Sequence, residues 1–234
     1  MKASDLVSKL RSLGDPAIAE HSQRFFKTGP GEYGEGDKFL GIRVPKLRAE
    51  IRAARALTLS ETLKLLRSPY HEARLLALLI LVDRFKRGEE STRERIYRHY
   101  LEQTCYINNW DLVDSSAPQI VGGHLYKRER SVLYRLVDSD NLWERRIAVM
   151  ATLTFIREQS FADTLSLCEA LIDDPEDLIH KASGWMLREV GNRDGKTERA
   201  FLRRHYQRMP RTMLRYAIEK FPAEERQRYL KSLI

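Results

Sequence analysis

The stretch RLLALLIL at residues 74–81 begins with an arginine and continues as an apolar run, and a related pattern returns three times along the chain. RIAVMATL begins at residue 146, KASGWMLREV at 181 and RYAIEKF at 215. The starts are 72, 35 and 34 residues apart. The first interval equals two repeats, and the repeat start between them would lie near Trp110. A period of about 35 residues with one helix pair per repeat is typical of an α-solenoid. We therefore predict HEAT-like helical repeats.

Helical periodicity covers nearly the whole chain, and no stretch alternates apolar and polar residues for long enough to predict a sheet. Asn109 and Pro175 are helix start signals, and glycine, proline and aspartate clusters separate the helices. The predicted fold class is all-α. The expected helices span roughly residues 3–12, 16–27, 45–55, 59–67, 71–87, 91–104, 109–124, 129–138, 142–157, 161–172, 176–191, 196–208, 211–220 and 222–233.

One segment breaks this regularity, TGPGEYGEGDK at residues 28–38. Its four glycines and one proline are unfavourable in a helix, so it is expected to form a loop. Two readings stay open, a simple connector and a loop that faces DNA. Because no linker or shift in composition divides the rest, residues 1–234 are predicted to form a single domain.

The composition favours a polyanionic partner. Lys and Arg number 41 against 33 Asp and Glu, which gives a net charge of +8 and favours nucleic acid over a membrane surface. The two cysteines, Cys105 and Cys168, form no disulfide framework or metal motif. The N-terminal MKASDLVSKL lacks the apolar core of a signal peptide, and no apolar run approaches the length of a membrane span. We expect a soluble, cytoplasmic protein.

The repeat predicts a row of cations. Equivalent positions of stacked repeats lie along one face, so Arg74, Arg146, Lys181 and Arg215 would form a basic concave face that follows a phosphate backbone. The alternative is that each side chain binds helix carbonyls or an acidic neighbour. Residues 193–215 add a strongly basic stretch that is the best candidate for clamping the backbone. It contains Arg193, Lys196, Arg199, Arg203, Arg204, Arg208, Arg211 and Arg215 against Asp194 and Glu198.

A second set of residues is suited to chemistry. Trp110 and Asp114 are four residues apart, so on a helix they share a face. Trp185 follows Lys181 in a later repeat, and Arg146 heads the helix between them. Indole faces attract cations, and a carboxylate between them can stabilise a developing oxocarbenium ion and orient a water. The alternatives are core packing for each tryptophan and a surface ion pair for Asp114.

Four segments resemble the AlkD family of DNA alkylation repair glycosylases. They are RFFKTGPGEYGEGDKFLGIRVPKLR (24–48), YINNWDLVDSSAP (106–118), NLWERRIAV (141–149) and HKASGWMLREVG (180–191), and they occur in the family's order. The resemblance runs from about residue 20 to the C-terminus. It implies a HEAT-like solenoid and a monofunctional glycosylase that releases N3- and N7-alkylated purines, such as 3-methyladenine and 7-methylguanine, without flipping the base into a pocket.

The resemblance also implies roles for individual residues. The family's paired tryptophans correspond to Trp110 and Trp185, its catalytic aspartate to Asp114, and its active-site arginine to Arg146. Arg145 is adjacent, so the arginine assignment is ambiguous by one position, and Arg145 is expected to contact DNA.

The sequence departs from the family's pattern near its N-terminal end. Phe25 stands where an aromatic hydroxyl can contact DNA in other members, and Arg43 stands where a polar contact occurs. The glycine-rich segment belongs to one branch of the family only.

The expected partner is double-stranded DNA containing alkylated bases, with no membrane and no obligate protein partner. No cofactor or metal is expected, because His71-Glu72 lacks the second histidine of a metalloprotease motif. A non-catalytic binder of damaged or branched DNA and a peptide-binding scaffold are the alternatives.

Overall fold

The computed structural model describes residues 1–234, and its regular secondary structure consists of helices apart from one isolated bridge between Lys38 and Tyr70. The all-α prediction is confirmed. Contacts divide the chain into two compact units, Met1–Ile120 (unit 1) and Val121–Ile234 (unit 2). The single domain expected over residues 1–234 stays a prediction. None of the helices combines the length and the apolar character needed to cross a bilayer.

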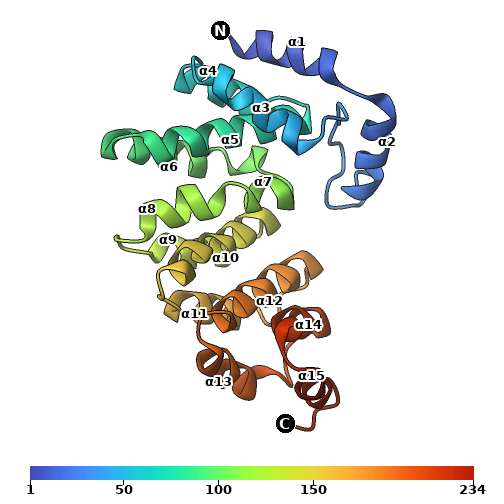
Figure 1. Cartoon of the computed structure of the whole chain (residues 1–234), viewed down its shortest axis with the longest axis vertical. Helices are drawn as coiled ribbons and strands as arrows, with labels where there is room; N and C mark the ends of the chain where they lie inside the picture. The colour runs from blue at the N-terminus through green and yellow to red at the C-terminus, as the bar shows by residue number, and fades with distance from the viewer. The chain divides into compact units, whose positions relative to one another are not determined.

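Unit 1 is built around α5 (His71–Arg87), which packs against α3, α4 and α6 (Figure 1). Residues 71–82 are all buried, so this helix is enclosed by its neighbours on every side. It contains the run RLLALLIL, and it supplies much of the core of unit 1. The other elements before residue 107 are α1 (Ala3–Leu13), α2 (Pro16–Phe25), α3 (Val44–Ala54), α4 (Leu59–Leu66), α6 (Glu90–Glu102) and the 3-10 turn η1 (Thr104–Tyr106).

The continuous helix predicted over residues 109–124 is wrong, because the structure interrupts it. The five-residue α7 (Trp110–Asp114) is followed by a π-helical turn, η2 (Pro118–Gly122), and by α8 (Gly123–Leu125). Pro118 has no backbone N–H, so it cannot donate the hydrogen bond to the Asp114 carbonyl that an unbroken helix requires. Asp114 therefore ends a short helix. Turns of this π-helical type are frequent at functional sites.

Unit 2 is centred on α10 (Leu142–Arg157) and α12 (Asp177–Gly191), which pack against each other. Gly184 allows α14 to approach α12 closely, since a Cβ at this position would lie 2.4 Å from the Met213 carbonyl oxygen. The glycine in KASGWMLREV therefore has a packing role. The remaining elements are α9 (Ser131–Val137), α11 (Ala162–Ala170), α13 (Gly195–His205), α14 (Arg211–Ala217), η3 (Ile218–Lys220) and α15 (Ala223–Leu230).

Candidate functional site

The short helix α7 carries two of the residues expected at a catalytic site. The Asn109 side-chain oxygen accepts a hydrogen bond from the Trp110 backbone N–H at 2.9 Å, which confirms the predicted helix start. Trp110 is the first residue of α7 and Asp114 the last, so the two share a helix face, and both are partly exposed. Leu112 and Val113, between them, are buried. Thus α7 presents an indole and a carboxylate together while its apolar residues hold it to unit 1.

Two phenylalanines at the end of α2 enclose one side of Trp110. The Phe26 ring stacks on the indole with the centroids 5.2 Å apart and the planes inclined by 21°. Phe25 meets the indole edge-on at 6.0 Å and is 56% exposed. Phe26 continues the stack towards Phe39 and His71, each at a centroid distance of 5.0 Å. Phe25 therefore places an exposed apolar ring beside Trp110.

His71, to which the sequence analysis gave no function, lies between two carboxylates. Its Nδ1 is 3.1 Å from an Asp37 oxygen, and its Nε2 is 2.8 Å from an Asp111 oxygen. The His71 side chain is only 2% exposed. Burial alone would lower the pKa of His71, but the two carboxylates raise it to about 9. At neutral pH the ring is therefore an imidazolium that donates to both aspartates.

The start of α5 anchors the chain directly after the glycine-rich segment. The Glu72 carboxylate accepts hydrogen bonds from the backbone N–H groups of residues 40, 41 and 42 at 2.7 to 3.1 Å. Gly34 packs so tightly that an added Cβ would lie 2.5 Å from the Phe26 carbonyl oxygen and 3.4 Å from the Asn109 amide nitrogen. The segment thus packs beside Asn109, the residue that caps α7, and it is part of unit 1.

Arg74 differs from the expected DNA-facing cation. It is 4% exposed, its guanidinium donates to Asp37 at 2.7 Å, and it also donates to the Ser68 carbonyl at 3.1 Å. Burial alone would raise the pKa of Asp37, but the His71 hydrogen bond and the Arg74 charge hold it below its usual value. These are the contacts expected under the alternative considered from the sequence, with a carbonyl and an acidic neighbour. A contact of Arg74 with DNA stays a prediction.

The other expected DNA ligand of unit 1, Arg43, is exposed and immediately precedes α3. Its contact with DNA stays a prediction.

In unit 2, the two candidate arginines at the start of α10 are both engaged within the protein. Arg146 is 4% exposed and donates to the Leu178 carbonyl in the first turn of α12. Arg145 forms an ion pair with Asp174 at 2.7 Å and donates to the Ser139 carbonyl at 2.9 Å. The structure thus shows which contacts hold each side chain. It leaves the choice of active-site arginine as a prediction.

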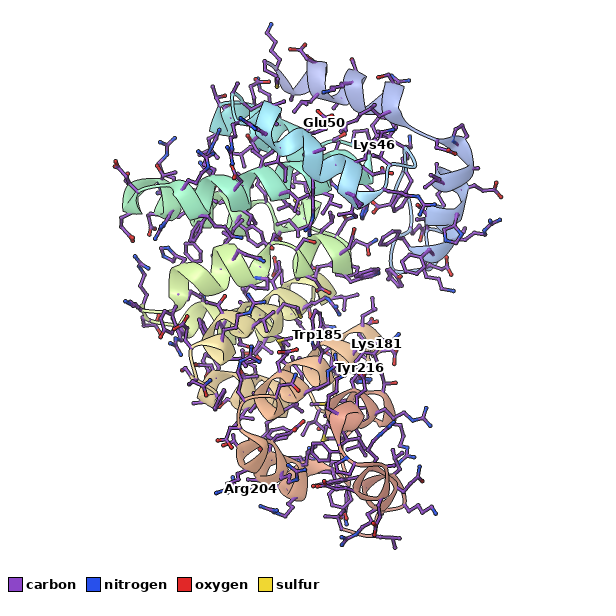
Figure 2. The ribbon with its side chains drawn as sticks, in the orientation of Figure 1. Lys46, Glu50, Lys181, Trp185, Arg204 and Tyr216 are labelled. Carbon is purple, nitrogen blue, oxygen red and sulfur yellow. The ribbon has the colours of Figure 1, made fainter.

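Trp185 and Lys181 lie one turn apart on α12, with Tyr216 of α14 close to them (Figure 2). The Trp185 indole N–H donates to Glu189 at 3.3 Å. The Lys181 ammonium pairs with Asp177 at 2.7 Å. Trp185 and Lys181 are both partly exposed, and Tyr216 is 36% exposed. Unit 2 therefore has a surface on which an indole, a phenol and an ammonium group are neighbours.

The basic residues 193–215 are partly neutralised within unit 2. Arg193 pairs with Glu189, Arg199 with Glu225, and Arg208 with Asp173. Arg211 and Arg215 of α14 are both exposed, and the Arg211 guanidinium donates to the Leu230 carbonyl at 2.9 Å. Arg204, on α13, is also exposed (Figure 2). Fewer cations of residues 193–215 are therefore candidates for binding DNA than the sequence alone suggests.

No group of three or more His, Cys, Asp or Glu side chains is arranged to hold a metal ion. Cys105 and Cys168 are free thiols.

The elements and side chains above define a helical-repeat protein with a tryptophan–aspartate pair on a short helix. A family model described as DNA alkylation repair enzyme matches residues 6–221, and the chain therefore belongs to this family. The structure is similar to that of a predicted DNA alkylation repair enzyme from Enterococcus faecalis, with a TM-score of 0.69 and 15% identity. The match covers 90% of this chain and 97% of the other, and it confirms the fold. No curated protein matches the chain.

Proposed function

We propose that this protein is a monofunctional DNA glycosylase that hydrolyses the N-glycosidic bond of cationic N3- and N7-alkylpurines in double-stranded DNA. Membership of a DNA alkylation repair family supports a role in the repair of alkylated DNA. The observation that carries the chemistry is that Trp110 and Asp114 share one partly exposed face of α7. That face offers an aromatic surface and a carboxylate within one helical turn.

The reaction needs little acid catalysis. An N3- or N7-alkylpurine is already cationic, so when the glycosidic bond breaks its electron pair passes to the purine and neutralises it. Positive charge then develops on the sugar. The Asp114 carboxylate stabilises this charge and accepts the proton of the water that attacks C1′. The indole of Trp110 adds a cation–π contribution of roughly 0.5–2 kcal/mol. The products are a free base and an abasic site.

The other candidate residues are assigned to DNA contacts. Trp185 presents a second indole, and Arg146, or its neighbour Arg145, is proposed to contact the phosphate beside the lesion. The exposed and partly exposed cations are proposed to bind the phosphate backbone without reading the base sequence. They are Arg43, Lys181, Arg211 and Arg215. The lesion is proposed to react without being flipped into a closed pocket.

The test is the release of free 7-methylguanine from an N-methylated duplex, measured by chromatography. We expect release from the methylated duplex, none from the unmodified duplex, and a remaining strand that breaks only after alkali treatment. Strand cleavage without alkali would contradict the monofunctional mechanism. Tight binding to branched or methylated DNA without base release would instead support the non-catalytic alternative. Failure to bind DNA at low salt would instead support the third alternative, a peptide-binding scaffold.

A further inference from the structure

Unit 1 contains a cluster of four charged side chains, three of them buried and one partly buried. His71 and Arg74 come from the first turns of α5, Asp37 from the glycine-rich segment and Asp111 from α7. His71 contacts both carboxylates, and Arg74 pairs with Asp37 at 2.7 Å. With the imidazole protonated, two positive and two negative charges balance. This balance makes the burial of His71, Arg74 and Asp37 and the partial burial of Asp111 tolerable.

The cluster acts on α7 because α7 cannot hold itself. A helix of five residues makes too few internal hydrogen bonds to be stable in isolation. Its orientation therefore depends on its attachments, which include the Asn109 cap, the buried Leu112 and Val113, and the bond from His71 to Asp111. The bond from His71 to Asp111 joins two charged groups.

The same imidazole joins the charged cluster to the aromatic stack on Trp110. The His71 ring lies 4.5 Å from Phe39 and 5.0 Å from Phe26, measured between centroids, and Phe26 stacks on Trp110. His71 thus reaches α7 by two routes, through the Asp111 carboxylate and through the Phe26 ring. Both routes end within one turn of Asp114.

We propose that His71 is a positioning residue for base excision, and that its bridge between Asp37 and Asp111 holds α7, with Trp110 and Asp114, in the reactive orientation. This inference rests on the proposed glycosylase function. It also gives a functional role to the packing of the glycine-rich segment against α7. The segment supplies Asp37, and its Gly34 packs against Asn109, which caps α7.

The groups that act on the imidazole determine how the positioning depends on pH. Asp37 faces it from the glycine-rich segment and Asp111 from α7, whereas Arg74 lies on the same helix as His71 and disfavours its charge. Glu72, the next residue on α5, directs its carboxylate to the backbone of residues 40–42. Loss of the His71 proton removes one donor from the bridge and leaves Arg74 as the one positive charge of the cluster against two carboxylates. Excision should therefore slow as the pH rises past the titration of His71.

The test measures single-turnover excision at saturating enzyme from about pH 6 to about pH 10, with spontaneous base release subtracted. The wild type should show an alkaline fall in rate. In Asp111→Asn this fall should begin at lower pH, because removal of a neighbouring negative charge lowers the pKa of the imidazole. In His71→Gln it should disappear, with the neutral-pH rate reduced about tenfold or more and the affinity for undamaged DNA little changed. His99→Gln, which alters a partly exposed histidine on α6 that pairs with Glu102, is the matched control.

An alkaline fall that begins at the same pH in Asp111→Asn and in the wild type would overturn the inference. Hydrogen exchange of His71→Gln at neutral pH gives a second measurement that does not need activity, and we expect faster exchange in residues 28–40 and 109–116. Unchanged exchange in those residues would overturn the inference as well. If the wild type releases no base at any pH, the proposed function fails, while the exchange result still decides whether His71 holds α7.

Discussion

Asp111 and Asp114 lie three residues apart in α7, yet the structure places them in different environments. Asp111 faces inwards to His71, whereas Asp114 lies on the partly exposed face that also carries Trp110. One Asp111 oxygen is buried without a hydrogen-bond partner, which makes its bond to His71 more important for its burial. Two chemically identical residues therefore have a structural and a proposed catalytic role.

The His71 bridge predicts how stability depends on pH. The pKa of His71 is about 9 in the folded protein against 6.5 for an ordinary histidine, so the bridge contributes fully below about pH 6.5. This contribution declines as the pH rises and is lost above about pH 9. Its upper limit is roughly 3 kcal/mol from the size of the shift. Urea unfolding should show that the free-energy difference between wild type and His71→Gln shrinks from pH 6 to pH 10.

The control for this prediction is again His99→Gln, which removes a partly exposed histidine. Its difference from the wild type should be small and nearly independent of pH. A His71→Gln difference that stays constant over the same range would mean that the ring makes only uncharged contacts.

At the scale of elements, the glycine-rich segment and α7 behave as one assembly. Gly34→Ala should disturb both, because the new Cβ would meet two backbone oxygens, those of Phe26 at 2.5 Å and Lys27 at 3.0 Å. Backbone atoms cannot move aside as a side chain can. We expect a loss of about 1–3 kcal/mol in unfolding free energy and slower excision.

Gly195→Ala is the matched control for this substitution. Gly195 is the first residue of α13, and the nearest atom to its added Cβ is the end of the flexible Arg199 side chain. Its stability should be close to that of the wild type. Equal stability of Gly34→Ala and Gly195→Ala would show that the segment is not packed as described.

The helices could largely be predicted from the sequence, because a helix produces a local periodic pattern of apolar residues. The long helices α5, α10 and α12 lie where predicted, with ends within about a residue. The interruption after Asp114 was missed, although Pro118 was a visible signal for it. The face shared by Trp110 and Asp114 was predictable from their spacing alone.

The rest of the candidate site could not be predicted because it depends on contacts between distant residues. His71 meets partners 34 and 40 positions away, and Arg145 meets Asp174 29 positions away. A single sequence does not reveal which distant residues are in contact. It therefore cannot distinguish an arginine that is paired within the protein from one that binds DNA. The polar residues His71, Glu72 and Arg74 at the start of an apolar helix were the local indication that buried polar partners would be needed.

At the scale of the molecule, the net charge of +8 overstates the cations available to DNA. Arg74 and Arg193 are held in buried or partly buried ion pairs, whereas Arg215 is exposed on α14. We expect Arg215→Ala to weaken binding to damaged and undamaged duplexes equally, by about three- to tenfold, and to reduce the salt slope by about one. Binding titrations at several salt concentrations measure both quantities.

Arg135→Ala removes the same charge from an exposed position on α9 and controls for net charge. It should weaken binding less than Arg215→Ala. Equal effects of the two substitutions would mean that overall charge, rather than the α14 surface, determines binding.

The role of Asp114 in base excision is tested most directly by comparing Asp114→Asn with the wild type in one pair of measurements. These are the single-turnover release of 7-methylguanine and the affinity for the same methylated duplex. We expect release to slow by on the order of a hundredfold or more while affinity changes by less than about threefold, since the carboxylate acts on charge that develops only in the transition state. Asp138→Asn, at an exposed position after α9, should match the wild type in both. Equal release rates for Asp114→Asn and the wild type would contradict the assignment of Asp114 as the catalytic carboxylate.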